Sequence, residues 1–151
     1  MVDVVVNLVV NFDGDGDLNL AGERRRLHKQ HSYGTADTSG MLSFQRLDVY
    51  QRAIEFLALV YDIVGELPRG NADRADQLMR SAESVVRNIA EGAGRWSEPD
   101  SASRYKIARG EAIECAASLD VLRLRKLVSD ARYAQGIHLL EGVVAMLTKM
   151  F

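Results

Sequence analysis

The sequence predicts an all-α protein, an antiparallel up-down-up-down four-helix bundle, preceded by a non-helical or disordered N-terminal extension. Two observations support this prediction. Apolar residues recur at alternating steps of three and four along four segments after residue 43, which is the spacing of one face of an α-helix. Short runs of glycine, proline and small polar residues separate these segments. Four helices of ~20 to 30 residues joined by short loops favour alternating directions.

The first predicted helix begins near Phe44 and ends before Pro68 and Gly70. It carries two neighbouring apolar stripes, which is more apolar surface than one intramolecular contact requires. One stripe is Leu47, Tyr50, Ile54, Leu57, Tyr61 and Val64, and the other is Val49, Ala53, Phe56, Val60, Ile63 and Leu67. Because exposed apolar surface of this extent usually indicates association, we expect a homo-oligomer.

Three further helices follow the first. The second predicted helix covers about residues 72–93. The third covers about residues 98–128, and Ser97 before it suits the N-cap position because its hydroxyl can accept a bond from a free helix amide. The fourth begins after Ser129 or Asp130 and continues to the last residues, with apolar stripes like those of the first.

Residues 1–40 differ in kind from the remainder of the chain. The run VDVVVNLVV has strand propensity, DGDGD is a cluster of structure breakers, and ERRRLHKQH is a run of charge. None of these runs repeats a helical period. We therefore expect residues 1–40 to be a poorly ordered extension and residues 41–151 to be the bundle. The alternative is that residues 1–40 are upstream sequence and that the natural protein starts at Met41.

The charge balance does not indicate nucleic acid as a partner. The formal net charge is -2. Residues 1–43 carry four Lys and Arg against six Asp and Glu, and residues 44–151 carry fifteen of each kind. Any nucleic-acid binding must therefore come from local basic patches, or from patches that symmetry repeats.

Nothing in the sequence indicates a membrane segment, a cofactor or a catalytic set. No apolar run approaches the ~20 residues that span a bilayer. The only cysteine, Cys115, shares a helical stripe with Ala112 and Leu119, which favours a small core residue over a nucleophile. Neither a nucleophile–base pair nor a set of metal ligands is recognisable. We expect a cytoplasmic, non-enzymatic protein that holds no cofactor or metal.

A stripe of mostly small polar residues runs along the second helix beside its core face. Its members are Gln77, Ser81, Ser84, Asn88, Glu91 and Arg95. Solvated faces usually carry long Lys and Glu side chains, so short ones suggest that another helix approaches closely. A buried amide left unpaired costs ~1 to 3 kcal/mol. We predict a structural polar network of Ser84, Asn88, Glu91, Arg95 and Glu114; a solvated face and a ligand site are the alternatives.

The glycine-containing run GAGR, residues 92–95, is a poor candidate for a phosphate-binding loop. It follows a helix where a Walker loop follows a strand, and it lacks the lysine of that loop. We interpret it as the end of the second helix and the turn into the third.

Two groups of basic residues are candidate nucleic-acid contacts, since arginine and lysine neutralise phosphate charge. They are Arg74, Arg80 and Arg87 on the second helix, and Arg123, Arg125, Lys126 and Arg132 around the end of the third. The alternative for the second group is structural, because cations near a helix C-terminus offset the helix dipole without any ligand.

Several short motifs stand out together: NIAEG (88–92), ARG (108–110) and EC (114–115), with FQRLDVYQRA (44–53) before them and AMLTKM (145–150) after them. Through these motifs the stretch from residue 80 to residue 122 resembles the 23S rRNA intervening-sequence proteins, once called S23 ribosomal proteins. The resemblance covers about residues 44–150. Glu111 stands where the family usually has a small serine, and residues 1–40 have no counterpart.

The resemblance implies an up-down bundle that assembles into a pentamer, with RNA or a ribonucleoprotein as the leading partner. A related group, the accessory proteins of diversity-generating retroelements, binds nucleic acid through basic surfaces, whereas the helical region of this chain is neutral. Five copies of a modest basic patch, binding together, would give a higher overall affinity for nucleic acid than one copy gives alone. The competing hypothesis is a protein-interaction scaffold that does not bind nucleic acid.

Overall fold

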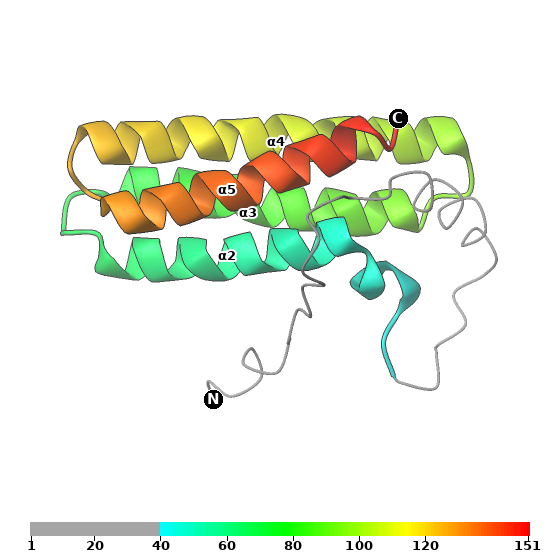
Figure 1. Cartoon of the computed structure of the whole chain (residues 1–151), viewed down its shortest axis with the longest axis horizontal. Helices are drawn as coiled ribbons and strands as arrows, with labels where there is room; N and C mark the ends of the chain where they lie inside the picture. The colour runs from blue at the N-terminus through cyan, green and yellow to red at the C-terminus, as the bar shows by residue number, and fades with distance from the viewer. Residues whose placement is uncertain (1–39) are drawn as a thin grey trace, which may run out of the picture.

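A computed structural model of the chain describes residues 40–151. Figure 1 shows four long helices side by side, joined by short turns. The elements are a 3-10 helix, η1 (Ser43–Arg46), and the α-helices α2 (Asp48–Glu66), α3 (Ala72–Ala93), α4 (Glu98–Leu124) and α5 (Asp130–Thr148). No residue from 40 to 151 is in a strand, so the prediction of an all-α fold with four helices is confirmed. The predicted extension, residues 1–40, lies outside the described residues except for Gly40.

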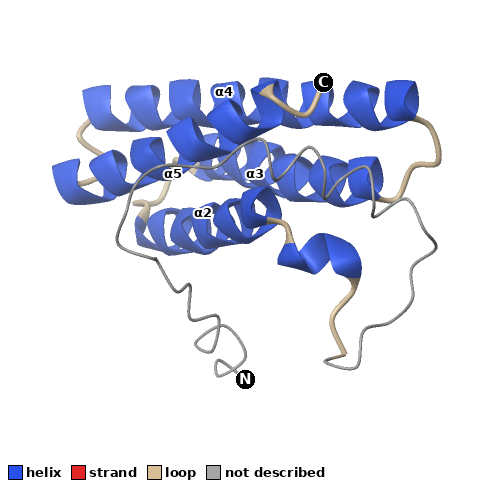
Figure 2. Cartoon of the chain, turned by 45° about the vertical axis from the view of Figure 1, so that its right-hand side comes forward, coloured by secondary structure: helices blue, strands red, loops and turns tan. Residues whose placement is uncertain are grey.

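The side-chain contacts between α3 and α4 run in antiparallel order. Ser81 of α3 bonds Glu114 of α4. Further along α3, Glu91 pairs with Arg104, which lies earlier in α4. Helix α5 packs against both α4 and α2, so the four helices enclose one core, as Figure 2 shows from a second direction.

The core contains buried apolar residues from all four helices. Its largest fully buried side chains include Phe56, Ile63, Leu78, Ile89, Leu119, Leu122 and Leu147. Each such side chain contributes ~1.5 to 3 kcal/mol relative to the same side chain left in water. Of the two stripes predicted on the first helix, the one that contains Phe56 and Ile63 is in this core, whereas Tyr61 of the other stripe is half exposed.

The first predicted helix is interrupted near its start. Leu47 has an extended backbone, with φ of −67° and ψ of 127°, and separates η1 from α2. The ring of Phe44 meets that of Tyr50 edge to face at 5.0 Å, and η1 packs against α3 as well as α2. The apolar spacing continues across the break because Leu47 and Tyr50 pack against the same core, so periodicity alone predicted one helix where there are two.

The third predicted helix ends earlier than expected, at Leu124 and not near Val128. The backbone amide of Leu127 donates to the carbonyl of Leu122 at 2.8 Å, and Lys126 takes a left-handed conformation with φ of 56°. This is the usual way in which a helix closes its last turn. Leu127 and Val128 then fold back against the core, which explains why their spacing predicted more helix.

The predicted N-cap Ser97 is confirmed, and Ser129 caps the last helix in the same way. The hydroxyl of Ser97 accepts from the amide of Asp100 at 3.3 Å, and that of Ser129 accepts from the amide of Arg132 at 3.2 Å. Each bond satisfies one of the amides that a helix leaves free in its first turn.

Candidate functional site

The polar stripe of α3 makes three separate groups of contacts. The first joins α3 to α4 through Glu114, whose Oε1 accepts from the hydroxyl of Ser81 at 2.9 Å and from the amide of Gln77 at 3.4 Å. Ser81 is buried, so Glu114 provides the bond that its hydroxyl would otherwise lack.

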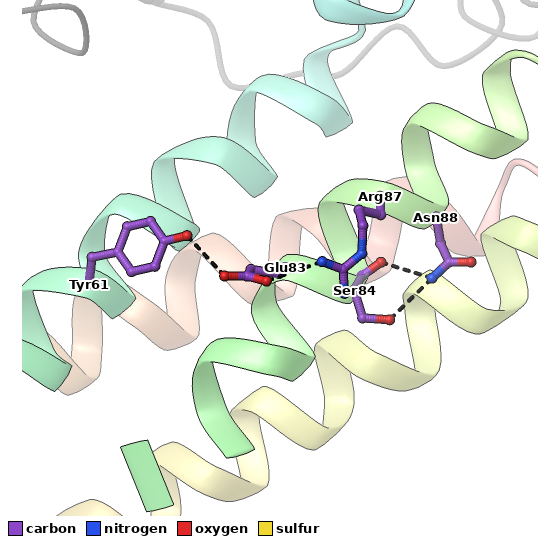
Figure 3. A network of polar contacts seen from close by, with 5 residues as sticks. All are labelled: Tyr61, Glu83, Ser84, Arg87 and Asn88. Atoms are coloured by element: carbon purple, nitrogen blue, oxygen red, sulfur yellow. Dashed lines mark hydrogen bonds and ion pairs between the residues drawn. The ribbon is translucent and has the colours of Figure 1, made fainter. Parts of the chain in front are cut away.

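The second group lies within α3 itself. Nδ2 of the buried Asn88 donates to the backbone carbonyl of Ser84 at 2.9 Å and to its Oγ at 3.2 Å, as Figure 3 shows. The side-chain amide of Asn88 thus finds both of its partners one turn earlier in α3, and these bonds do not reach α4. Because Ser84 and Asn88 are short and bond each other, they extend little from α3 and allow another helix to pack closely against it.

The third group is at the far end of the stripe. Oε2 of Glu91 pairs with Arg95 at 3.4 Å and with Arg104 of α4 at 3.1 Å. The five residues predicted to form one network thus form three clusters, two of which join α3 to α4. The prediction did not include Arg104, because only the antiparallel register places it opposite Glu91.

A further polar chain lies on the side of α3 that faces α2. The hydroxyl of Tyr61 donates to Glu83 at 3.2 Å, and Arg87 pairs with the other oxygen of Glu83 at 3.1 Å (Figure 3). Partial burial and the bond to Glu83 both raise the pKa of Tyr61. This contact places Tyr61 of α2 level with Glu83 of α3.

Most of the predicted nucleic-acid contacts form ion pairs within the protein. Arg80 pairs with Asp76 at 3.1 Å, and Arg87 with Glu83. Arg132 of α5 bonds Glu66 of α2 at 2.6 Å. These contacts occur at exposed or partly exposed side chains, where an ion pair contributes ~0 to 1 kcal/mol, so exchange for a phosphate is possible but must first break the internal pair.

Arg123 also has partners within the protein. It pairs with Asp130 at 3.2 Å, and its guanidinium lies 4.4 Å from the centre of the Tyr133 ring. The hydroxyl of Tyr133 donates to Asp120 at 2.6 Å, a bond that raises the pKa of Tyr133. Arg123 is therefore fixed at the α4–α5 junction.

Arg74, Arg125 and Lys126 differ from the other candidates. Arg74 bonds only the amide oxygen of Asn71, at 3.3 Å, and Arg125 and Lys126 are exposed with no carboxylate partner among residues 40–151. All three lie at the end of the bundle that holds the α2–α3 and α4–α5 turns, on the left of Figure 1. We call this end the turn end. Arg69, in the α2–α3 turn, lies there as well and also has no carboxylate partner in the described region.

Cys115 is fully buried in α4. Burial, followed by the charges of Glu111 and Glu114, raises the pKa of the thiol to about 12. Reactive thiols need a lowered pKa and access to solvent, so Cys115 acts as a core residue. Within the described part of the chain, no three His, Cys, Asp or Glu side chains form a group that could hold a metal ion, and no helix is both long and apolar enough to cross a bilayer.

Comparison with known proteins gives a family and a fold. The family model described as 23S rRNA-intervening sequence protein matches residues 45–149. One similar solved structure is the crystal structure of a protein with unknown function from the S23 ribosomal protein family of Bacteroides thetaiotaomicron VPI-5482. It is 21% identical, with a TM-score of 0.63 over 68% of this chain and 93% of that chain. No curated protein matches this chain.

Proposed function

Because the chain belongs to the 23S rRNA-intervening sequence protein family, we propose that it is a non-enzymatic, self-associating four-helix bundle of the cytoplasm that binds RNA, free or within a ribonucleoprotein. The observation that carries this proposal is the turn end. There Arg69, Arg74, Arg125 and Lys126 have no carboxylate partner among the described residues. A cation without an internal partner is available to a phosphate.

Self-association increases the effect of this small patch. Each phosphate contact releases counterions, so RNA affinity depends on the number of cations that reach the backbone together. A ring of several copies, for which a pentamer is our expectation, would repeat the turn end around one rim. The second and later contacts would then be intramolecular, which strengthens binding without any new kind of contact.

The backbone of Lys126 supports a role for this side chain beyond the fold. A left-handed conformation costs a residue other than glycine ~1 kcal/mol, and glycine is the usual residue at this position after a helix. Lysine at such a position retains a charge at the expense of stability. Strain of this kind often marks functional positions.

Salt-dependent binding to rRNA fragments tests the proposal. Fluorescence anisotropy of a labelled fragment should give an affinity that falls as salt increases, with a slope of ~0.7 per neutralised phosphate on a log–log plot. The double variant R125Q/K126A should have a shallower slope. The control R80Q alters a cation that is already paired with Asp76 and should change the slope less. No binding at low salt, or an affinity that does not respond to salt, contradicts RNA binding.

The competing function, a protein-interaction scaffold, is favoured by one observation: large apolar side chains such as Leu124 are exposed on α4. Capture of partners from lysate with and without nuclease distinguishes the two functions. RNA binding predicts that nuclease releases the captured material. Proteins that stay bound after nuclease treatment, with no RNA in the untreated sample, favour the scaffold.

A further inference from the structure

The outer face of α4, opposite the core, is an uninterrupted stripe without charge. Its members are Gly110, Ile113, Ala117, Val121 and Leu124, which we call the outer α4 stripe. All five are exposed, with Ile113 at 46%, Val121 at 48% and Leu124 at 85% of full exposure. At 1.5 Å per residue the stripe is ~20 Å long. Monomeric proteins rarely leave a continuous apolar surface of this kind in water.

No contact among the described residues requires a glycine at position 110. A Cβ atom added there would meet nothing within 4 Å, unlike one at Gly136, which would lie 2.8 Å from Leu119. A glycine in the interior of a helix costs ~1 kcal/mol relative to alanine. The close approach of a second helix from outside would account for a glycine at this position, because a side chain there would hold the two backbones apart.

A second apolar stripe lies on the outer face of α2. Its members are Tyr50, Ile54, Ala58, Tyr61 and Gly65, which we call the outer α2 stripe, and all of them are exposed or partly exposed. Gly65 also has open space where a Cβ would be. Because α2 and α4 each pack against α3 and α5, the two outer stripes lie on opposite sides of the bundle (Figure 1).

The two stripes overlap along part of the bundle's length. Tyr61 of α2 bonds Glu83 of α3, and Ser81, two residues earlier in α3, bonds Glu114 of α4. Tyr61 is therefore level with about Ile113. Since α2 and α4 run in the same direction, this register places Ala58, Tyr61 and Gly65 level with Gly110, Ile113 and Ala117. Val121 and Leu124 extend past the end of α2 at Glu66.

Placing two copies side by side matches the stripes by size where they overlap. The register brings Tyr61 of one copy opposite Ile113 of the next, Ala58 opposite Gly110, and Gly65 opposite Ala117. Small residues thus meet small residues on either side of a large pair, which lets the helix axes approach closely.

The charges beside the stripes are also complementary. Lys106 and Arg109 border the outer α4 stripe on the side of α5, where Arg109 bonds Thr148. Glu55 borders the outer α2 stripe on the side of Asp62, which also faces α5. In the same register Glu55 of one copy is level with Lys106 of the next. Neither Glu55 nor Lys106 forms an ion pair within residues 40–151.

From these observations we infer that the outer α4 stripe of one copy packs against the outer α2 stripe of the next. This inference rests on the proposed self-association and names its interface. The contact joins two different surfaces, so a row of copies leaves one unpaired stripe at each end, and closure into a ring gives every copy both contacts.

Disulfide trapping tests the pairing directly. Y61C and I113C variants are co-expressed and oxidised, and mass spectrometry identifies the linked chains. We expect the mixed Tyr61–Ile113 disulfide to exceed either symmetric product. Wild-type protein, whose only cysteine is buried, serves as the control without a cross-link. Symmetric I113C dimers as the main product, or an oligomer in which no mixed disulfide forms, overturn the inference.

Two substitutions distinguish a specific, closely packed interface from unspecific apolar association. G110L adds apolar surface but fills the space where the second backbone would lie, and I113D adds charge. Both should reduce the mass measured by light scattering and leave the circular dichroism spectrum helical, because both sites are open to solvent in a single copy. The control A134D lies on the exposed face of α5 and should leave the mass unchanged.

The outcomes separate this interface from self-association itself. Wild-type protein that is monomeric at micromolar concentration contradicts both. Wild-type oligomers that persist in G110L and I113D contradict only this interface, as does an A134D variant that dissociates. Larger assemblies of G110L would indicate unspecific apolar association and would also contradict it.

Discussion

A Cβ atom added at Gly92 of α3 would lie 2.5 Å from Cε1 of Tyr105 in α4. Both residues are buried, with Tyr105 only 4% exposed. The tyrosine ring therefore occupies the space that a side chain at position 92 would need. This glycine allows the first half of α4 to lie directly against the end of α3.

We expect G92A to destabilise the protein by ~1 to 3 kcal/mol, the usual effect of overpacking a core. Urea denaturation monitored by circular dichroism measures this change. In a Tyr105→Leu background the same substitution should cost less, since the smaller side chain leaves room. An equal cost in both backgrounds would show that the ring does not cause the penalty.

The Ser81–Glu114 bond gives a second prediction. E114A leaves the buried hydroxyl of Ser81 without its carboxylate partner, and we expect a loss of ~1 to 3 kcal/mol in the free energy of unfolding. Adding S81A should restore part of this loss, because the unsatisfied hydroxyl is then removed as well. A double-mutant cycle from denaturation curves measures the coupling, and strictly additive losses contradict the proposed dependence.

Lys126 allows backbone strain and charge to be tested separately. K126G relieves the left-handed strain, so we expect it to stabilise the protein by ~1 kcal/mol and raise the melting temperature by a few degrees. K126A removes the same charge but keeps the strain, and its melting temperature should not rise. Both variants should weaken RNA binding to a similar extent. If K126G is not more stable than K126A, the strain is absent in solution.

High pH should lower stability in two steps. Burial raises the pKa of Tyr105 from 10.0 to about 12, and that of Cys115 rises from 9.0 to about 12. In both cases the folded protein favours the neutral form, so each group makes its full contribution to stability at pH values below its pKa in the unfolded chain. Above pH 9 the unfolded thiol loses its proton while the folded thiol keeps it, so stability falls; Tyr105 adds to the fall above pH 10.

Thermal unfolding at a series of pH values checks this prediction. The melting temperature of the wild-type protein should begin to fall near pH 9, and that of C115A should stay flatter between pH 9 and 10. Parallel curves for the two proteins would mean that the thiol does not contribute.

Local chemistry made several features of this chain predictable. The four helices followed from apolar spacing, and the cap at Ser97 followed from a hydroxyl side chain at a helix start, since each depends on neighbours within about one turn. Spacing failed at Leu47 and after Leu124, where the chain leaves the helix but its apolar side chains still contact the core.

The choice of partners could not be predicted from local chemistry. The sequence identified Glu91 and Glu114 as polar positions beside a helix contact, but their bonds to Arg104 and Ser81 depend on the register between α3 and α4. The basic residues gave a similar result. Composition selected seven candidates, and the fold paired four of them with acidic side chains, Arg80, Arg87, Arg123 and Arg132.

The sequence by itself determined the helices, the core face of each and the family, because periodicity and motifs are properties of the chain. Only the tertiary structure decided that Gly92 makes room for Tyr105 whereas Gly110 faces open space, and that the apolar faces of α2 and α4 lie on opposite sides and overlap in height. Such relationships arise when residues far apart in the chain occupy neighbouring positions, and the packing of four helices fixes that arrangement.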